Sequence, residues 1–124
     1  MTVLVVDDER DAELLFRQRF RKEVRAGMIT LVFAFSGEEA VAYLSSESAD
    51  AVLVLSDINM PGMNGLDLLR HIKASRPDLP VLMVTAYEGD FQSRAIELGA
   101  DGYINKPIDF DSLKTRIFHF PGNA

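Results

Sequence analysis

Short apolar runs alternate in this sequence with longer segments whose apolar residues recur every three or four positions. The apolar runs cover residues 3–6, 30–35, 51–55, 80–84 and 102–105. This alternation predicts strands joined by helices, and therefore a parallel sheet. The run at 51–55 contains only Ala, Val and Leu, which is typical of a central parallel strand that is covered on both faces.

The segments between the strands predict five helices, because their apolar residues keep helical spacing. We place these helices at residues 9–25, 36–44, 65–74, 90–98 and 109–118. Gly27 is a natural residue to follow the end of the first helix. Ser36 and Glu39 form the pattern of a capping box at the start of the second.

Right-handed crossovers between parallel strands place helices on both faces of the sheet. We therefore predict an α/β fold, namely a flavodoxin-like, doubly wound, five-stranded parallel sheet with strand order 2-1-3-4-5 and five helices. The 124 residues suffice for one domain spanning 1–124. It stays open whether that domain is cut from a longer multidomain protein.

Composition removes several classes of function. Without cysteine the chain has no disulfide and no thiolate metal site. Its net charge of −6 argues against direct binding of nucleic acid. No apolar run approaches the ~18 residues of a membrane span, and no signal peptide is visible, so we expect no membrane association and a cytoplasmic location.

Polar residues stand at the exits of four predicted strands. Asp7 and Asp8 follow the first strand, Asp57 the third, Thr85 the fourth and Lys106 the fifth. Parallel strands end at the same edge of a sheet, and the order 2-1-3-4-5 places the first and third strands side by side. We therefore expect Asp7, Asp8 and Asp57 to meet in one crevice.

Each of these residues also has an ordinary structural explanation. Asp8 could cap the first helix, and Asp57 could form an Asx-turn. Lys106 could be a solvated surface lysine, and Thr85 a strand-end residue. Three adjacent carboxylates, however, repel one another unless a cation neutralises them. Oxygen ligands without His or Cys suit a hard cation, which predicts Mg²⁺, or Mn²⁺, as the cofactor.

The chain resembles the receiver domain of two-component response regulators over essentially its whole length. Four motifs carry the resemblance in order and spacing: Val-Val-Asp7-Asp8-Glu, Asp57-Ile-Asn-Met-Pro-Gly-Met-Asn-Gly65, Val-Thr85-Ala86 and Gly99-Ala-Asp-Gly-Tyr103-Ile-Asn-Lys106-Pro107. Any one of these motifs would be a weak signal, whereas four in register are specific.

The resemblance implies a role for each residue of the metal and phosphoryl site. Asp57 would be the phosphoacceptor. Asp8 would bind the metal directly, Asp7 mainly through water, and Asn59 through its backbone carbonyl. Lys106 would bridge to the phosphoryl group, and its bond to the following proline would be cis.

The resemblance also implies a switch and a path for water. Thr85 would move toward the phosphoryl oxygens, and Tyr103 would fill the space that Thr85 leaves. Helix 90–98, strand 102–105 and helix 109–118 would form the surface that changes. Asn59 and Tyr87 would border the path of the water that attacks the phosphoryl group.

The resulting expectation is a phosphoacceptor signalling domain rather than a turnover enzyme. A sensor histidine kinase, a phosphotransfer protein or a small phosphodonor would supply the phosphoryl group. The output domain or downstream protein stays unknown, and homodimerisation stays open. The alternatives are a Mg²⁺-dependent phosphohydrolase with an aspartyl-phosphate intermediate, and a degenerate receiver that only binds a protein partner.

Overall fold

The computed structural model describes residues 1–46, 49–86 and 90–119, without the side chains of 90–92. Its strands are β1 (Thr2–Val6), β2 (Thr30–Ala34), β3 (Ala51–Asp57), β4 (Val81–Thr85) and β5 (Gly102–Asn105). They form one parallel sheet in the order β2-β1-β3-β4-β5. The predicted fold class and strand order are therefore confirmed.

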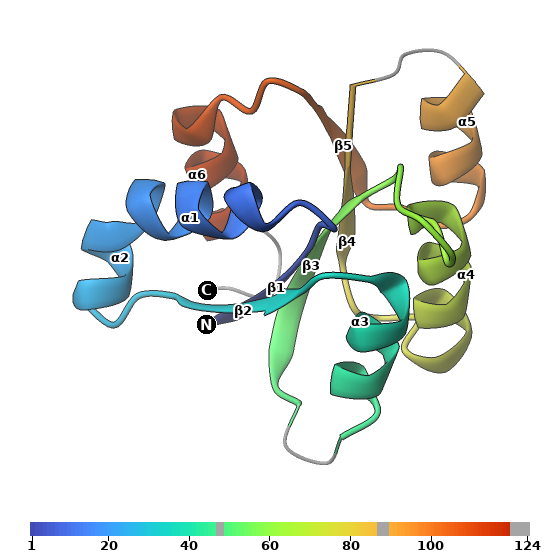
Figure 1. The fold of residues 1–124 in the computed structure, drawn as a ribbon, viewed down its shortest axis with the longest axis horizontal. Coiled ribbons are helices and arrows are strands. Elements are labelled where there is room, and N and C mark those ends of the chain that lie inside the picture. The colour runs from blue at the N-terminus through green and yellow to red at the C-terminus, as the bar shows by residue number, and fades with distance from the viewer. Residues whose placement is uncertain (47–48, 87–89, 120–124) are drawn as a thin grey trace.

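In the part of the chain that the structure describes, six helices cover the two faces of the sheet. They are α1 (Arg10–Arg19), α2 (Arg21–Arg25), α3 (Gly37–Leu44), α4 (Gly65–Ser75), α5 (Asp90–Glu97) and α6 (Phe110–Phe118). Figure 1 shows α1, α2 and α6 on one side of the sheet, and α3, α4 and α5 on the other. The chain thus winds over both faces, as right-handed crossovers require.

The prediction of five helices was wrong, because the segment 9–25 is broken at Phe20. That residue has φ −101° and ψ 13°, so the helical path is interrupted between α1 and α2. Phe20 is fully buried, and its ring stacks on Phe16 with centroids 6.0 Å apart. Val24 is 42% exposed instead of facing the core. Phe16 and Phe20 keep the predicted helical spacing, but the spacing of apolar residues does not indicate the interruption at Phe20.

The sheet separates two apolar cores. Leu4, Val54 and Met83 belong to the core beneath α3, α4 and α5. Val3, Leu55 and Leu82 belong to the other, where phenylalanines of α1 and α6 pack edge to face. Alternate side chains of one strand point into opposite cores, and this alternation fixes the register of each central strand.

The start of α3 and the end of α2 follow local sequence signals. Ser36 Oγ accepts a hydrogen bond from Glu39 N (3.0 Å), and Glu39 Oε1 accepts one from Phe35 N (3.4 Å). The predicted capping box is thus present, although the returning bond goes one residue before the cap. Gly27, with φ 73°, follows the end of α2 as predicted.

A lysine near the end of α4 ties together the edge of the sheet where β4 and β5 begin. Lys73 Nζ donates to the carbonyl of Leu79 (2.8 Å) and to Asp101 Oδ2 (2.9 Å). The same carboxylate oxygen accepts from Val81 N at 2.8 Å. The chain segments that lead into β4 and β5 are therefore fixed to α4.

Among the described residues, no helix is both long and apolar enough to cross a membrane.

An ion pair joins α2 to α6. Lys114 Nζ lies 3.1 Å from Glu23 Oε2, and both side chains are largely covered. Burial alone would raise the pKa of Glu23, but its backbone hydrogen bond and the contact with Lys114 outweigh burial and lower the pKa. A carboxylate with a lowered pKa stabilises the fold above its unfolded-state pKa, and that stabilisation disappears as the pH falls through the folded-state pKa.

We expect Glu23→Gln to lower the free energy of unfolding at pH 7 by roughly 1 kcal/mol, the upper end for partly exposed pairs. The difference from wild type should vanish once the pH falls below the lowered pKa of Glu23. Urea denaturation at several pH values measures both. Glu13→Gln, which breaks the more exposed ion pair between Glu13 and Arg17, is the control and should have a smaller effect. A pH-independent loss in Glu23→Gln would contradict this account.

Candidate functional site

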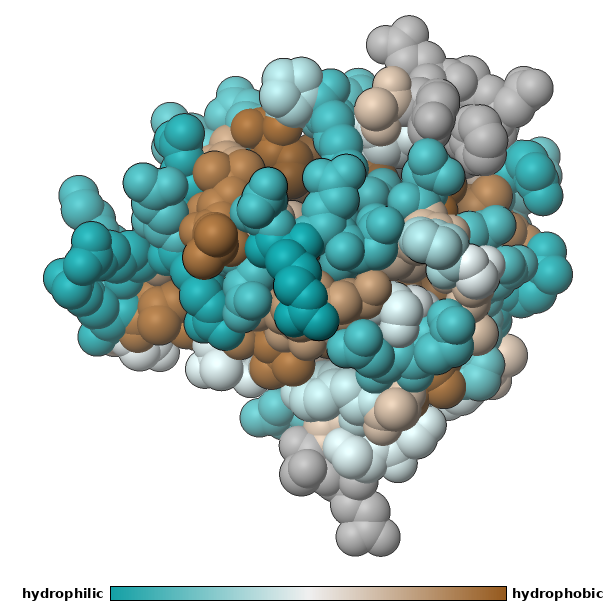
Figure 2. Space-filling view, viewed as in Figure 1, coloured by the Kyte–Doolittle hydropathy of each residue, from teal (hydrophilic) through white to brown (hydrophobic). Residues whose placement is uncertain are grey.

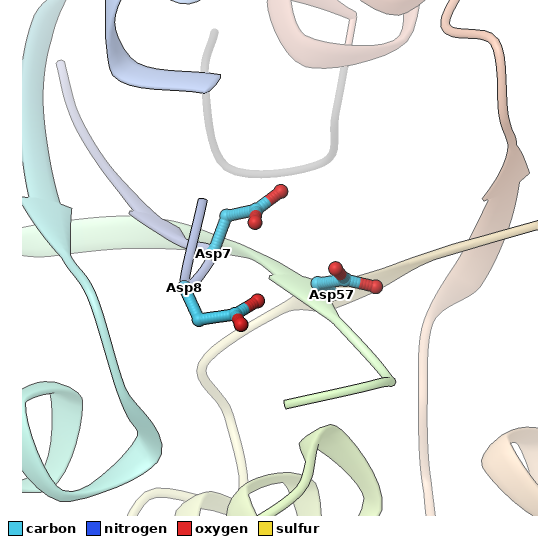
Figure 3. Close-up of side chains that lie close together, drawn as sticks. All are labelled: Asp7, Asp8 and Asp57. Atoms are coloured by element: carbon cyan, nitrogen blue, oxygen red, sulfur yellow. The ribbon is translucent and has the colours of Figure 1, made fainter. Parts of the chain in front are cut away.

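Three carboxylates meet where β1 and β3 end. Asp7 and Asp8 follow β1, Asp57 is the last residue of β3, and the two strands are neighbours that pair Val6 with Ser56. Figure 3 shows the three side chains at this edge of the sheet, and one oxygen of each lies within 4.8 Å of the others. Strand order alone therefore brings together residues fifty positions apart, as expected from the sequence.

Backbone amides hold two of these carboxylates. Asp7 Oδ1 accepts from Glu9 N (2.9 Å), and Asp57 Oδ1 accepts from Asn59 N (3.3 Å). The Asx-turn considered for Asp57 is thus present, but it coexists with the cluster instead of replacing it. Asp8 is not the helix cap, because α1 begins after Glu9 and has no side-chain cap. Asp57 is buried (7% exposed), so few waters solvate its charge.

Lys106 supplies the positive charge of the site. Its Nζ lies 3.1 Å from Asp57 Oδ2 and 4.0 Å from Asp7 Oδ2. Burial would lower the pKa of Lys106, but the hydrogen bond and charge of Asp57, together with the charges of Asp7 and Glu9, raise it. The ammonium group therefore stays charged at neutral pH. The Lys106–Pro107 peptide bond is cis, as the resemblance implied.

One lysine does not neutralise three carboxylates. Burial raises the pKa of Asp7, the backbone hydrogen bond from Glu9 lowers it, and the charge of Asp57 raises it further. The net effect is a raised pKa, as expected for clustered acids. The three carboxylates offer only oxygen ligands, and Mg²⁺ in proteins commonly keeps several waters besides one or two carboxylates. The donor set fits Mg²⁺ or Mn²⁺ and does not suit a softer metal.

Of the remaining predicted residues, Thr85 and Tyr103 lie in β4 and β5, and Asn59 follows β3. Thr85 is the last residue of β4, is 1% exposed, and pairs with Asn105 of β5. Tyr103 lies in the edge strand β5 and is 39% exposed. Asn59 is exposed in the segment after β3. Tyr87 lies outside the residues that the structure describes.

A groove beside the cluster was not expected from the sequence. It has a volume of about 590 Å³ and runs between α1 and the segment that joins β5 to α6. Asp7 and Lys106 are among its charged lining residues, and Leu15, Ile108 and Phe110 are among its apolar ones. Figure 2 shows apolar side chains gathered at the surface in the region of α1 and α6. No local sequence motif predicts this groove, because it depends on how α1 and α6 pack against each other.

Gly65 is a second feature that sequence reasoning missed. A Cβ at this position would overlap the carbonyl oxygen of Asp57 and lie 2.6 Å from Ile58 Cα. Gly65 N donates to the carbonyl of Ile58 at 2.8 Å. The start of α4 is thus packed against the backbone of the central acid, and only glycine leaves room for this approach.

Comparison with known proteins identifies the family. Residues 3–118 match the family described as the response regulator receiver domain. The chain is 34% identical over 120 residues to a cyclic di-GMP phosphodiesterase of Thermotoga maritima, covering 96% of this chain and 30% of that protein. It is 42% identical over 114 residues to the C4-dicarboxylate transport transcriptional regulatory protein of Rhizobium meliloti, covering 90% of this chain and 23% of the relative.

Solved structures agree with this assignment. A response regulator receiver protein from Pseudomonas putida superposes with a TM-score of 0.83 at 28% identity, covering 94% of this chain and 93% of the other. A response regulator from Thermotoga maritima, solved in complex with Mg²⁺ and BeF, gives a TM-score of 0.78 at 32% identity, covering 94% and 95%. The chain belongs to the receiver domain family of two-component response regulators, and is thus a signalling domain. It spans less than half the length of the curated relatives named here.

We expect Asp8→Asn to stabilise the protein in the absence of divalent cations by about 1 kcal/mol. The reason is that charges ~4 Å apart interact by several kcal/mol even at an effective dielectric constant of ~20. Millimolar Mg²⁺ should raise the melting temperature of wild type but not of the variant, since only the protein that binds the ion gains stability from it.

Differential scanning calorimetry with EDTA or with MgCl₂ measures both effects. Asp78→Asn, which removes the same charge from an exposed position, is the matched control and should behave like wild type. An Asp8→Asn variant that is less stable than wild type in EDTA would contradict the repulsion argument.

Proposed function

We propose that this domain accepts a phosphoryl group on Asp57 from the phosphohistidine of a partner protein, or from a small phosphodonor such as acetyl phosphate. The partner would be a sensor histidine kinase or a phosphotransfer protein. The observation that carries the proposal is the placement of Lys106 Nζ 3.1 Å from Asp57 Oδ2, beside three carboxylates that lie within 4.8 Å of one another. Membership of the receiver family supports the same chemistry.

In the proposed reaction an oxygen of Asp57 forms a bond to phosphorus while the bond from phosphorus to the donor nitrogen breaks. The electron pair leaves with the donor imidazole, and the product is an acyl phosphate. Lys106 then pairs with a phosphoryl oxygen in place of the carboxylate. Little covalent work falls to the protein, because positioning and charge neutralisation carry the rate. Attack of water on the acyl phosphate returns Asp57 to its carboxylate form.

Four residues would hold the metal ion. Asp8 and Asp57 would bind it directly, Asp7 mainly through water, and Asn59 through its backbone carbonyl. A bound Mg²⁺ supplies the positive charge that offsets both the carboxylates and the phosphoryl oxygens. The oxygen-only donor set and the excess of negative charge support this assignment.

The proposed switch starts at Thr85. Its hydroxyl would donate to a phosphoryl oxygen, and Tyr103 would move into the space that Thr85 leaves. Thr85 is buried at the end of β4, and Tyr103 is partly exposed in the adjoining strand. The phosphoryl group would favour one of two arrangements of α5, β5 and α6 through these contacts.

For the partner that responds to phosphorylation, we propose only that an output domain or a downstream protein exists. The named relatives include a transcriptional regulator and a phosphodiesterase, but this chain matches less than a third of either. A single receiver domain over residues 1–124, joined to or acting on an output that stays unspecified, is consistent with that overlap. Homodimerisation through α5, β5 and α6, and a cytoplasmic location, stay predictions.

Incubation with acetyl phosphate and Mg²⁺ tests the proposal against the two alternatives. We expect one phosphoryl group per chain, stable to acid and labile to base, measured by intact-mass spectrometry. Asp57→Ala should abolish the adduct, whereas Asp78→Asn should retain it. Multiple turnover of a phosphate ester would instead indicate a phosphohydrolase. Failure to form any adduct would indicate a degenerate receiver that only binds a partner.

Tyr87→Ala should shorten the lifetime of the phosphoryl group. In receivers this position and that of Asn59 border the path of the attacking water, and tyrosine is bulky, so its removal should admit water more easily. The rate of phosphate release from the isolated acyl phosphate measures this effect. A release rate in Tyr87→Ala that equals or falls below that of wild type would contradict it.

A further inference from the structure

Of the residues that would hold the metal, Asp57 ends β3, and the other three lie on two loops, one after β1 and one after β3. Asp7 and Asp8 belong to the first, which leads into α1 without a side-chain cap. Asn59 belongs to the second, and its N–H fixes Asp57 Oδ1. Ligand groups on loops need support from neighbouring structure, because shifts well below 1 Å weaken a metal site.

The corner between β2 and α3 lies against both loops, although it offers no ligand. This β2–α3 corner consists of Phe35, Ser36, Gly37 and Glu38. The capping contacts of Ser36 and Glu39 fix it to α3. Just before it, the carbonyl of Ala34 accepts a hydrogen bond from Asp7 N at 3.1 Å.

On the side of the first loop, the corner holds the start of α1 through an aromatic contact. Arg10 Cζ lies 4.0 Å from the centroid of the Phe35 ring. Arg10 is the first residue of α1 and comes two residues after Asp8. A guanidinium this close to a ring face is attracted to it. The contact therefore restricts where the loop that carries Asp7 and Asp8 can lie.

On the side of the second loop, the contact depends on a missing side chain. A Cβ on Gly37 would lie 2.8, 2.9 and 3.0 Å from Cγ, Sδ and Cβ of Met63. The last of these atoms is attached to the loop backbone, so a methyl group on Gly37 would displace the loop as well as the thioether. One residue earlier in the loop, a Cβ on Gly62 would lie 3.2 Å from Glu38 Oε2.

We propose that the β2–α3 corner positions the metal ligands, with Phe35 and Gly37 as positioning residues that hold the two ligand loops at a fixed separation. The inference rests on the proposed metal-dependent function. It extends that function to residues that touch neither the metal nor the phosphoryl group. The corner contacts the start of α1, directly after the first loop, through the Phe35 ring, and it leaves room for Met63 of the second loop because Gly37 has no side chain.

Calorimetric titration with MgCl₂ tests the Gly37 contact through a double-mutant cycle. Gly37→Ala should weaken Mg²⁺ binding by about tenfold, the lower end of what displaced supporting groups cost. In the double variant Gly37→Ala/Met63→Gly all three close atoms are gone, so binding should recover toward that of Met63→Gly alone. Thermal denaturation in EDTA establishes that each variant is folded.

A second arm tests the aromatic contact without changing any charge. Phe35→Leu should weaken Mg²⁺ binding severalfold, because an aliphatic side chain offers no π face to Arg10. Phe35→Tyr keeps the ring and should bind Mg²⁺ like wild type. This pair does not disturb α3, whose cap is Ser36.

The outcomes distinguish failure of the role proposed for the β2–α3 corner from failure of the proposed metal-dependent function. Wild-type affinity in both Gly37→Ala and Phe35→Leu would overturn the role of the corner while leaving the proposed function intact. Failure of the double variant to bind better than Gly37→Ala would likewise overturn the Gly37 contact. Absence of Mg²⁺ binding by wild type would overturn the proposed function and this inference together.

Discussion

Repulsion among clustered carboxylates is the constraint on which the site depends. Asp7, Asp8 and Asp57 are brought within 4.8 Å by the pairing of β1 with β3, and Lys106 offsets only part of their charge. Packing of the sheet supplies the free energy that keeps them together, since both of its faces are covered by apolar cores. Because the carboxylates are held together against their repulsion, binding of a cation is favourable and needs no rearrangement to bring the ligands together.

Much of the fold was predictable because its signals are local and repeated. The five strands, their order and the caps at Ser36 and Gly27 follow from apolar runs, crossover handedness and residue-specific backbone preferences. The meeting of Asp7, Asp8 and Asp57 follows from strand order alone. The approach of Lys106 to Asp57 was expected from its place after the fifth strand and from the family resemblance.

Features that depend on contacts between distant segments could not be predicted in this way. The interruption of the helix at Phe20, whose ring packs against Phe16 and Phe110, is not indicated by the periodicity of one segment. The need for glycine at 65 arises from the backbone of Asp57, and that at 37 from Met63. In each case the sequence shows the residue but does not show which distant residue it contacts.

The network of Lys73, Asp101 and Val81 has a mechanical consequence. It fixes the beginnings of β4 and β5 to α4 at the edge of the sheet opposite the carboxylates. The two strands are also paired at their opposite ends, where Thr85 of β4 lies beside Asn105 of β5. β4 and β5 are therefore fixed to α4 at their amino ends and to each other from Gly102 to Asn105. Any displacement of α4 is thereby passed to both strands together.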